Sequence, residues 1–152
     1  MKSAAADQDD KVMNLLAERV EGSRAELVGR YLQILQESLF ANRAFVRPGM
    51  LKQTAAEEAA AVLSYLGQAG FSGGEHGGKL HQAGFNVGTV LKLNEVTRGF
   101  LLDHFEDHQT RFILEVVDRY QQAVIEGFIQ GIDQEHRTEL ERMRTALRGG
   151  AG

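Results

Sequence analysis

Two histidines in a glycine-rich stretch have a placement that could support chemistry. His76 and His81 lie in "SGGEHGGKLHQAGFNVG", residues 72–88. The pattern puts His81 at the end of a short helix, before a glycine corner and a long apolar helix. An imidazole in such a place can be the axial ligand of a haem iron, within a wall of aromatic side chains. The aromatic residues available for that wall are Phe71, Phe85, Phe100, Tyr31 and Tyr65. The alternative is structural: His81 packs at a helix end and the glycines allow the bend.

A second pair of histidines has a spacing that suits a metal ion. His104 and His108 occur in "DHFEDH", residues 103–108, and an i, i+4 spacing places both on one helix face. They could bind zinc or another divalent metal, with Glu106 or Asp107 nearby. The glutamate that follows the first histidine in helical zinc-protease motifs is missing. The alternative is that these residues form the solvated, charged end of a helix.

No catalytic motif emerges from the remaining residues. The segment "GGEHGGK" has the glycines and lysine of a phosphate loop, but neither a leading strand nor a Ser/Thr after the lysine. No GxSxG motif is present, and the absence of cysteine excludes thiol catalysis and thiolate zinc sites. We therefore expect a protein that is not an enzyme, with no catalytic residue and no cofactor. Haem on His81 is the open alternative.

The composition narrows the classes of partner. The chain has 152 residues, 43% of them hydrophobic, and a formal net charge of −4. This acidic balance argues against nucleic acid, whose phosphates need clustered Lys and Arg. No run of about 18 apolar residues suggests a membrane helix, and the N-terminus "MKSAAADQDD" lacks the apolar core of a signal peptide. We expect a cytoplasmic protein that binds neither nucleic acid nor membrane.

The elements that would position these histidines are helical. The chain has a single proline, and apolar residues recur at helical spacing from Val12 onward. Gly22-Ser23 divides the first such segment, and "RPGM" at residues 47–50 marks a turn before the next. The sequence predicts an all-α bundle. Its expected parts are a disordered N-terminus (1–9), a helical domain (10–133), an exit helix that could form a coiled coil (134–148) and a disordered tail (149–152).

Within a long segment without proline, residues 110–147, the part from 112 to 132 carries two apolar stripes. Together they are wider than the face that a surface helix buries, so a second copy of the chain is the expected partner of one of them. Gly127 and Gly131, four residues apart, would permit a close approach to that copy. The predicted dimer interface consists of Val116, Tyr120, Val124, Ile125, Phe128, Ile129 and Ile132. Beyond it, Leu140, Met143 and Leu147 keep the narrow 3,4 spacing of a coiled-coil seam.

The order of these features resembles a known family. An Ala/Glu-rich helix, a glycine-rich turn, "KLHQAGFNVGTVLKLNEVTRGFLLDHF" and a charged exit helix are similar to the globin-related N-terminal sensory domains of bacterial signalling proteins. The closer likeness is to the non-haem, RsbR-type domains of stressosome proteins, where a Gly-Phe corner and a later Arg stand as Gly84-Phe85 and Arg98 do here. The more distant likeness is to haem-binding globin-coupled sensors, whose axial histidine would correspond to His81.

The resemblance implies a globin-like fold, a homodimer, and a signal passed to a C-terminal output domain or a downstream signalling protein. Our leading hypothesis is therefore a non-catalytic sensor and dimerisation module. One competing hypothesis is a haem-binding gas or redox sensor that uses His81. Another is a small metal-binding protein or enzyme that uses His104 and His108.

Overall fold

The described part of the chain is all-helical, as the sequence predicted. A computed structural model describes residues 4–39, 47–67, 71–105 and 109–150, and these residues form six helices and no strand. The helices are α1 (Ala4–Gly22), α2 (Arg24–Glu37), α3 (Pro48–Leu66), α4 (Gly73–Gln82), α5 (Val87–His104) and α6 (Thr110–Gly150). Within the described residues, none of these helices combines the length and the apolar character needed to cross a membrane.

The helix ends agree with most of the local signals. Ser23 separates α1 from α2, as expected. The turn predicted at residues 47–50, with a helix starting near Leu51, was wrong: Pro48 already begins α3, where its ring fixes a helical φ. One terminal prediction was wrong: α1 begins at Ala4, so residues 4–9 are helical rather than disordered. Three consecutive alanines, the best helix formers, favour this extension. At the other end, α6 includes Gly149 and Gly150, which the sequence assigned to a disordered tail.

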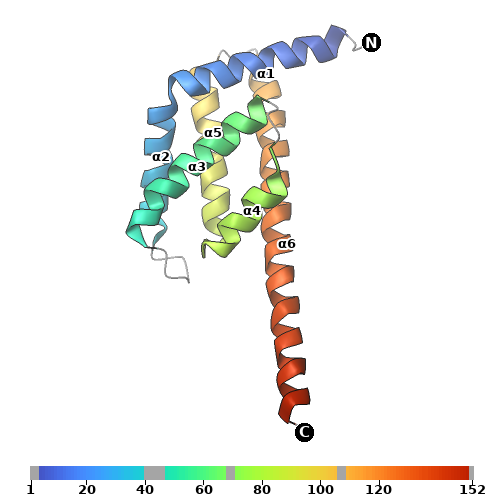
Figure 1. Ribbon diagram of the computed structural model, residues 1–152. Helices are drawn as coiled ribbons and strands as arrows, with labels where there is room; N and C mark the ends of the chain where they lie inside the picture. The colour runs from blue at the N-terminus through green and yellow to red at the C-terminus, as the bar shows by residue number, and fades with distance from the viewer. Residues whose placement is uncertain (1–3, 40–46, 68–70, 106–108, 151–152) are drawn as a thin grey trace.

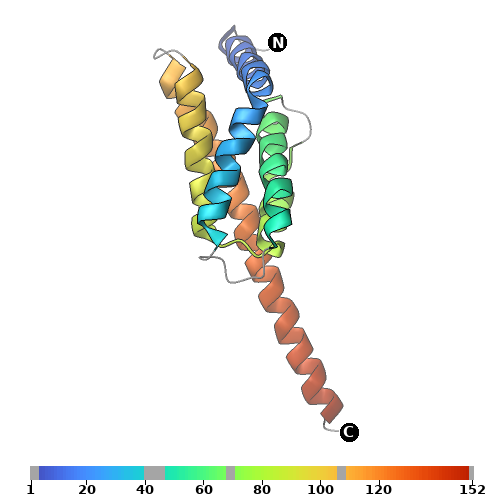
Figure 2. The ribbon, with the colours of Figure 1, turned by 90° about the vertical axis from the view of Figure 1, so that its left-hand side faces the viewer.

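The helices form a bundle from which one helix emerges alone. Figure 1 shows the first part of α6 along one side of a bundle that also contains α2, α3, α4 and α5, with α1 lying across one end of them. Figure 2, a quarter turn away, shows α2 between α3 and α5 with α6 behind it. The second part of α6 projects far beyond the bundle in both views. This arrangement agrees with the predicted exit helix.

The core is built from one face of each helix. Tyr31 from α2, Leu93 and Phe100 from α5, and Ile113 and Val117 from α6 are all almost completely buried. Leu16 and Val20 of α1 close the end of this core. The buried side chains of α6 lie between Ile113 and Phe128, so its later turns have few packing contacts with the bundle.

Candidate functional site at the root of the exit helix

Helices α4 and α6 pack with their backbones in contact, because glycines line both sides. A Cβ atom on Gly77 would lie 2.0 Å from the carbonyl oxygen of Val124, and one on Gly73 would lie 2.4 Å from the Cβ of Ala123. A Cβ on Gly127 would lie 2.6 Å from the carbonyl oxygen of Gly73. This corrects the sequence prediction that Gly127 and Gly131 face another copy of the chain. They face α4 of the same chain instead.

The turn after α4 is the predicted corner between a short helix and a long one. Gly84 has φ 94°, in the left-handed region that favours glycine. Two residues later, the Asn86 side chain accepts a hydrogen bond of 2.8 Å from the backbone N–H of Thr89 and so caps α5. At the other end of α4, the Ser72 hydroxyl accepts from the N–H of Glu75 in the same way. Both ends of α4 are therefore fixed by local chemistry.

His81 connects the end of α4 to the first turn of the exit helix. Its Nε2 lies 2.6 Å from Oε2 of Glu135, while its ring stands edge-on to Phe128 at 5.2 Å between centroids. The ring also lies against the α6 backbone, because a Cβ on Gly131 would be only 3.1 Å from Cδ2 of His81. In the described structure, His81–Glu135 is a hydrogen-bonded link between the bundle and the exit helix.

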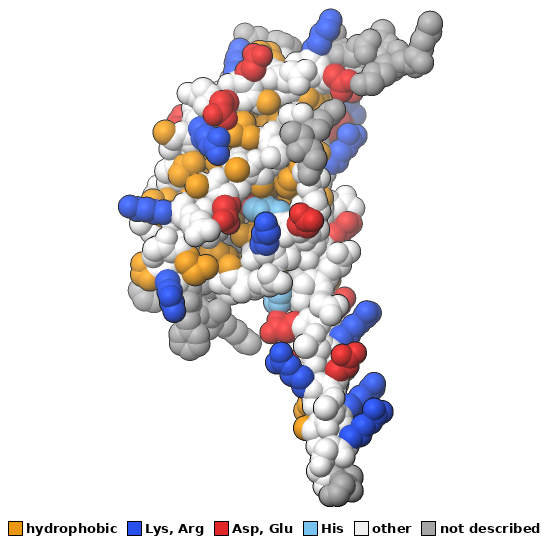
Figure 3. Space-filling model, in the orientation of Figure 1, with side chains coloured by type: hydrophobic (Ala, Val, Ile, Leu, Met, Phe, Trp, Pro, Cys, Tyr) orange, Lys and Arg blue, Asp and Glu red, His pale blue; other side chains and the backbone are white. Residues whose placement is uncertain are grey.

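Two hollows flank the His81–Glu135 pair. One, of about 580 Å³, is partly apolar and is lined by His81, Gln82, Gly84, Phe85, Asn86, Val87, Phe128, Ile132 and Glu135. The other, of about 510 Å³, is polar and is lined by Gly78, His81, Gln82, Gly131, Gln134, Glu135, Thr138, Glu139 and Arg142. Figure 3 shows charged side chains gathered along the exit helix below the bundle. A small molecule in either hollow would touch both α4 and the exit helix.

The predicted haem residues do not gather around His81. Tyr31 and Phe100 are buried in the core, and Tyr65 packs against Phe71, 5.6 Å between ring centroids. Only Phe85 among the predicted aromatic residues lines a hollow beside His81. The Nε2 atom that would bind iron is the one that contacts Glu135. His81 thus lies at a surface junction between two helices, with Glu135 as its polar partner.

A buried polar cluster lies behind this junction. Glu58 of α3 is 1% exposed; one carboxylate oxygen accepts a 2.8 Å hydrogen bond from the Tyr120 hydroxyl, and the other contacts Nε2 of His76. Burial raises the pKa of Tyr120 well above 10, and the Glu58 carboxylate raises it further. Tyr31 has a raised pKa for the same two reasons, although its hydrogen bond to Thr97 acts in the opposite direction. The cluster joins α3, α4 and α6.

Sequence analysis missed Glu58 and placed Tyr120 elsewhere, yet a signal was present. Glu58 falls between Ala55 and Val62 on the face of α3 that carries Leu51 and Leu66, so it interrupts an apolar stripe. A charged residue on such a face needs partners in the core. His76, from the opening stretch, is that partner, and its role here is to hold α4 against α3.

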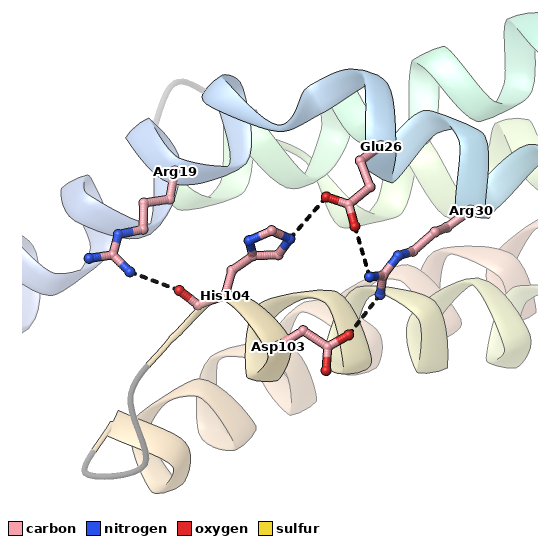
Figure 4. Close-up of polar contacts among 5 residues, drawn as sticks. All are labelled: Arg19, Glu26, Arg30, Asp103 and His104. Carbon is pink, nitrogen blue, oxygen red and sulfur yellow. Dashed lines mark hydrogen bonds and ion pairs between the residues drawn. The ribbon is translucent and has the colours of Figure 1, made fainter.

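His104 belongs to a different group, at the far end of α5. Figure 4 shows His104 and Asp103 facing Glu26 and Arg30 of α2, with Arg19 of α1 beside them. Nε2 of His104 lies 3.1 Å from Glu26, and Arg30 bridges Glu26 and Asp103 at 2.9 and 3.1 Å. Arg19 donates a 2.8 Å hydrogen bond to the carbonyl oxygen of His104.

This group explains His104 as a contact between helices. The bonds to Asp103 and Glu26 raise the pKa of Arg30 despite some desolvation. The other predicted metal ligands, Glu106, Asp107 and His108, lie outside the described residues. Within the described part of one chain, no three His, Asp or Glu side chains are grouped so as to hold a metal ion.

The predicted dimer interface is divided between the core and the surface. Val116, Tyr120, Val124 and Phe128 are buried within the single chain, so they are not free to meet a partner. Ile125 packs partly against the core, whereas Ile129 and Ile132 are 49% and 44% exposed. The sequence showed two apolar stripes, but the predicted interface included residues that the single chain buries in its own core. Val87 and Leu91 of α5 are also exposed.

Comparisons of the chain with protein-family models, with curated proteins and with solved structures gave no match.

Proposed function

We propose that this chain is a non-catalytic sensory and dimerisation module of a bacterial signalling protein. It would act in the cytoplasm as a homodimer, with a globin-like bundle as the sensing part, and would pass its signal along the exit helix to a C-terminal output domain or a downstream signalling protein. The order of a short helix, a Gly84 corner and two long helices supports the globin-like relationship.

One observation carries the proposal: an apolar stripe on α6 continues from the bundle onto the projecting helix. Ile129 and Ile132 are about half exposed, and Leu140, Met143 and Leu147 are 45%, 63% and 75% exposed. Fully burying such a side chain is worth roughly 1.5–3 kcal/mol. A second copy, packed alongside in parallel, would cover all five positions, and the two exit helices would then leave side by side.

The root of the exit helix supplies a route for a signal. Glu135 is in the first turns beyond the bundle, and its contact with His81 ties that turn to α4. A molecule that enters either adjoining hollow would compete with this contact or reinforce it. Paired helices with two packings of similar energy respond to such small shifts by changing their separation or register.

Sedimentation of the purified chain tests the proposal. We expect a dimer at micromolar concentration, and a monomer for the double variant Ile129→Glu/Ile132→Glu. The matched control is Met50→Glu, which also places a glutamate at an exposed apolar position (37% exposed) but on α3, outside the stripe. Circular dichroism should show unchanged helicity in both variants. A wild-type monomer at micromolar concentration would contradict the proposal.

A further inference from the structure

The apolar stripe of α6 has a regular spacing with one polar member. Its positions are 125, 129, 132 and 136, and then 136, 140, 143 and 147, so that spacings of 4, 3 and 4 occur twice. A helix turns through about 100° per residue, which keeps all seven positions within an arc of roughly 80°. Six of them are Ile, Leu or Met, and the central one is His136. An 11-residue repeat of this kind suits helices that pair with little supercoiling, or with a slightly right-handed one.

His136 has carboxylates on both sides of it and no hydrogen-bond or ion-pair partner among the described residues. Asp133 and Glu139 stand three residues before and after it, where side chains on a helix are neighbours. All three side chains are exposed, and none forms a hydrogen bond or ion pair with the described residues. A lone imidazole at the centre of an apolar seam is costly to bury unless it gains a polar partner.

We propose that the paired exit helices bind a divalent metal ion, of the zinc class, between the His136 side chains of two chains. This inference rests on the proposed function, because a single chain offers one imidazole where the site needs two. In a parallel pair, equivalent seam positions face each other across the two-fold axis. Both His136 rings would then meet there, and Asp133 or Glu139 of each chain would complete the coordination.

The residue types fit this ion. Zinc takes four ligands in a tetrahedron, and imidazole nitrogens with carboxylate oxygens are a usual set. In di-iron and di-manganese bundles, a glutamate and a histidine at i, i+3 bind one metal ion from the same helix, and Asp133 stands at that spacing from His136. The ion would give the buried imidazoles their polar partner, and it would lock the register of the seam at His136.

The direct test is zinc titration of the full chain by calorimetry, with cobalt as a spectroscopic substitute. We expect one zinc per two chains and the visible absorption bands of tetrahedral cobalt. Sedimentation should show the dimer dissociation constant falling about a hundredfold when free zinc is a hundred times its own dissociation constant. His136→Leu should remove zinc and cobalt binding while the chain stays dimeric without metal, because leucine completes the apolar seam. His104→Gln is the matched control, because it removes a histidine that contacts Glu26 at the far end of α5, outside the seam, and it should still bind zinc.

Asp133→Asn and Glu139→Gln identify the carboxylate ligand, since the variant of the true ligand should weaken zinc binding at least tenfold. Zinc binding that survives in His136→Leu, or no zinc binding by the wild-type dimer, would overturn the metal site and leave the dimer standing. A chain that is monomeric without metal and dimeric with one zinc per pair would support the site and contradict the constitutive dimer. A monomer that binds no zinc would overturn both.

Discussion

The packing of α4 on α6 makes a sharp prediction at two neighbouring glycines. Gly77 faces α6, and an alanine there would put its Cβ 2.0 Å from the Val124 carbonyl oxygen and 2.6 Å from the Phe128 backbone nitrogen. Gly78, the next residue, faces open space, with nothing within 4 Å of an added Cβ. We expect Gly77→Ala to destabilise the fold and Gly78→Ala to stabilise it.

The magnitudes follow from the contacts. The shortest contact at position 77 is about 1.4 Å closer than the 3.4 Å of ordinary contact, and backbone atoms cannot rotate away. Overpacking of this kind costs about 1–3 kcal/mol or more, while replacing a helical glycine by alanine gains roughly 1 kcal/mol. We therefore expect a net loss of about 2 kcal/mol for Gly77→Ala and a gain of about 0.5–1 kcal/mol for Gly78→Ala.

Thermal and urea unfolding at one fixed protein concentration measure both variants. For a domain of this size, the expected changes correspond to a fall in Tm of about 4–8 °C for Gly77→Ala and a rise of about 1–4 °C for Gly78→Ala. Equal Tm values for the two variants would refute the close packing of α4 on α6. A Gly77→Ala variant that is more stable than the wild type would also refute it, because α4 and α6 would then have to be far enough apart to accommodate a Cβ atom at position 77.

Two further predictions concern the buried phenols and His81. Because burial raises the pKa of Tyr31 and Tyr120 above the value of about 10 in the unfolded chain, the folded state holds their protons more tightly, and the free energy of unfolding should fall as the pH rises above 10. Tyr120→Phe should reduce this fall, but it should also cost about 1–3 kcal/mol near neutral pH, because Glu58 loses a hydrogen-bond donor. A free energy of unfolding that stays constant up to about pH 12 would contradict the prediction. Because His81 already contacts Glu135 at a surface junction, we expect haem titration of the wild-type chain to give no stoichiometric Soret band. A stoichiometric band in the wild-type chain that disappears in His81→Ala would favour the haem-sensor hypothesis.

The sequence was sufficient for the elements, because helix signals are local. The 3.6-residue spacing predicted the long last helix, and Gly84 with Phe85 marked the corner that the structure has at φ 94°. The all-α class and the projecting helix follow from the same patterns. Residues 4–9 were misjudged because polar residues outweighed the helix propensity of the alanines.

The site could not be predicted as fully, because it depends on which helices meet. Gly127 and Gly131 signalled a close approach, but nothing local distinguishes a second copy from α4 of the same chain. The glycines at positions 73 and 77 of α4 have the same spacing of four, and matching the two pairs would have pointed to the correct contact. Similarly, Glu58 and His76 are 18 residues apart on different helices, so only the packing of α4 reveals their contact.

These contacts make α4 a connection between the helical bundle and the exit helix. On one side, His76 of α4 contacts Glu58 of α3. If α4 moved away, the buried Glu58 carboxylate would lose one of its two partners, His76 and Tyr120. On the other side the glycines fix the α4 backbone against α6, so α4 and the root of the exit helix move together. Glu58 of α3 thus contacts α6 directly, through Tyr120, and contacts α4 through His76, while His81–Glu135 lies where α6 leaves the bundle. The glycine contacts therefore hold α4 against α6 as far as Gly131, and the described side chains of α6 beyond Phe128 are not buried in the bundle.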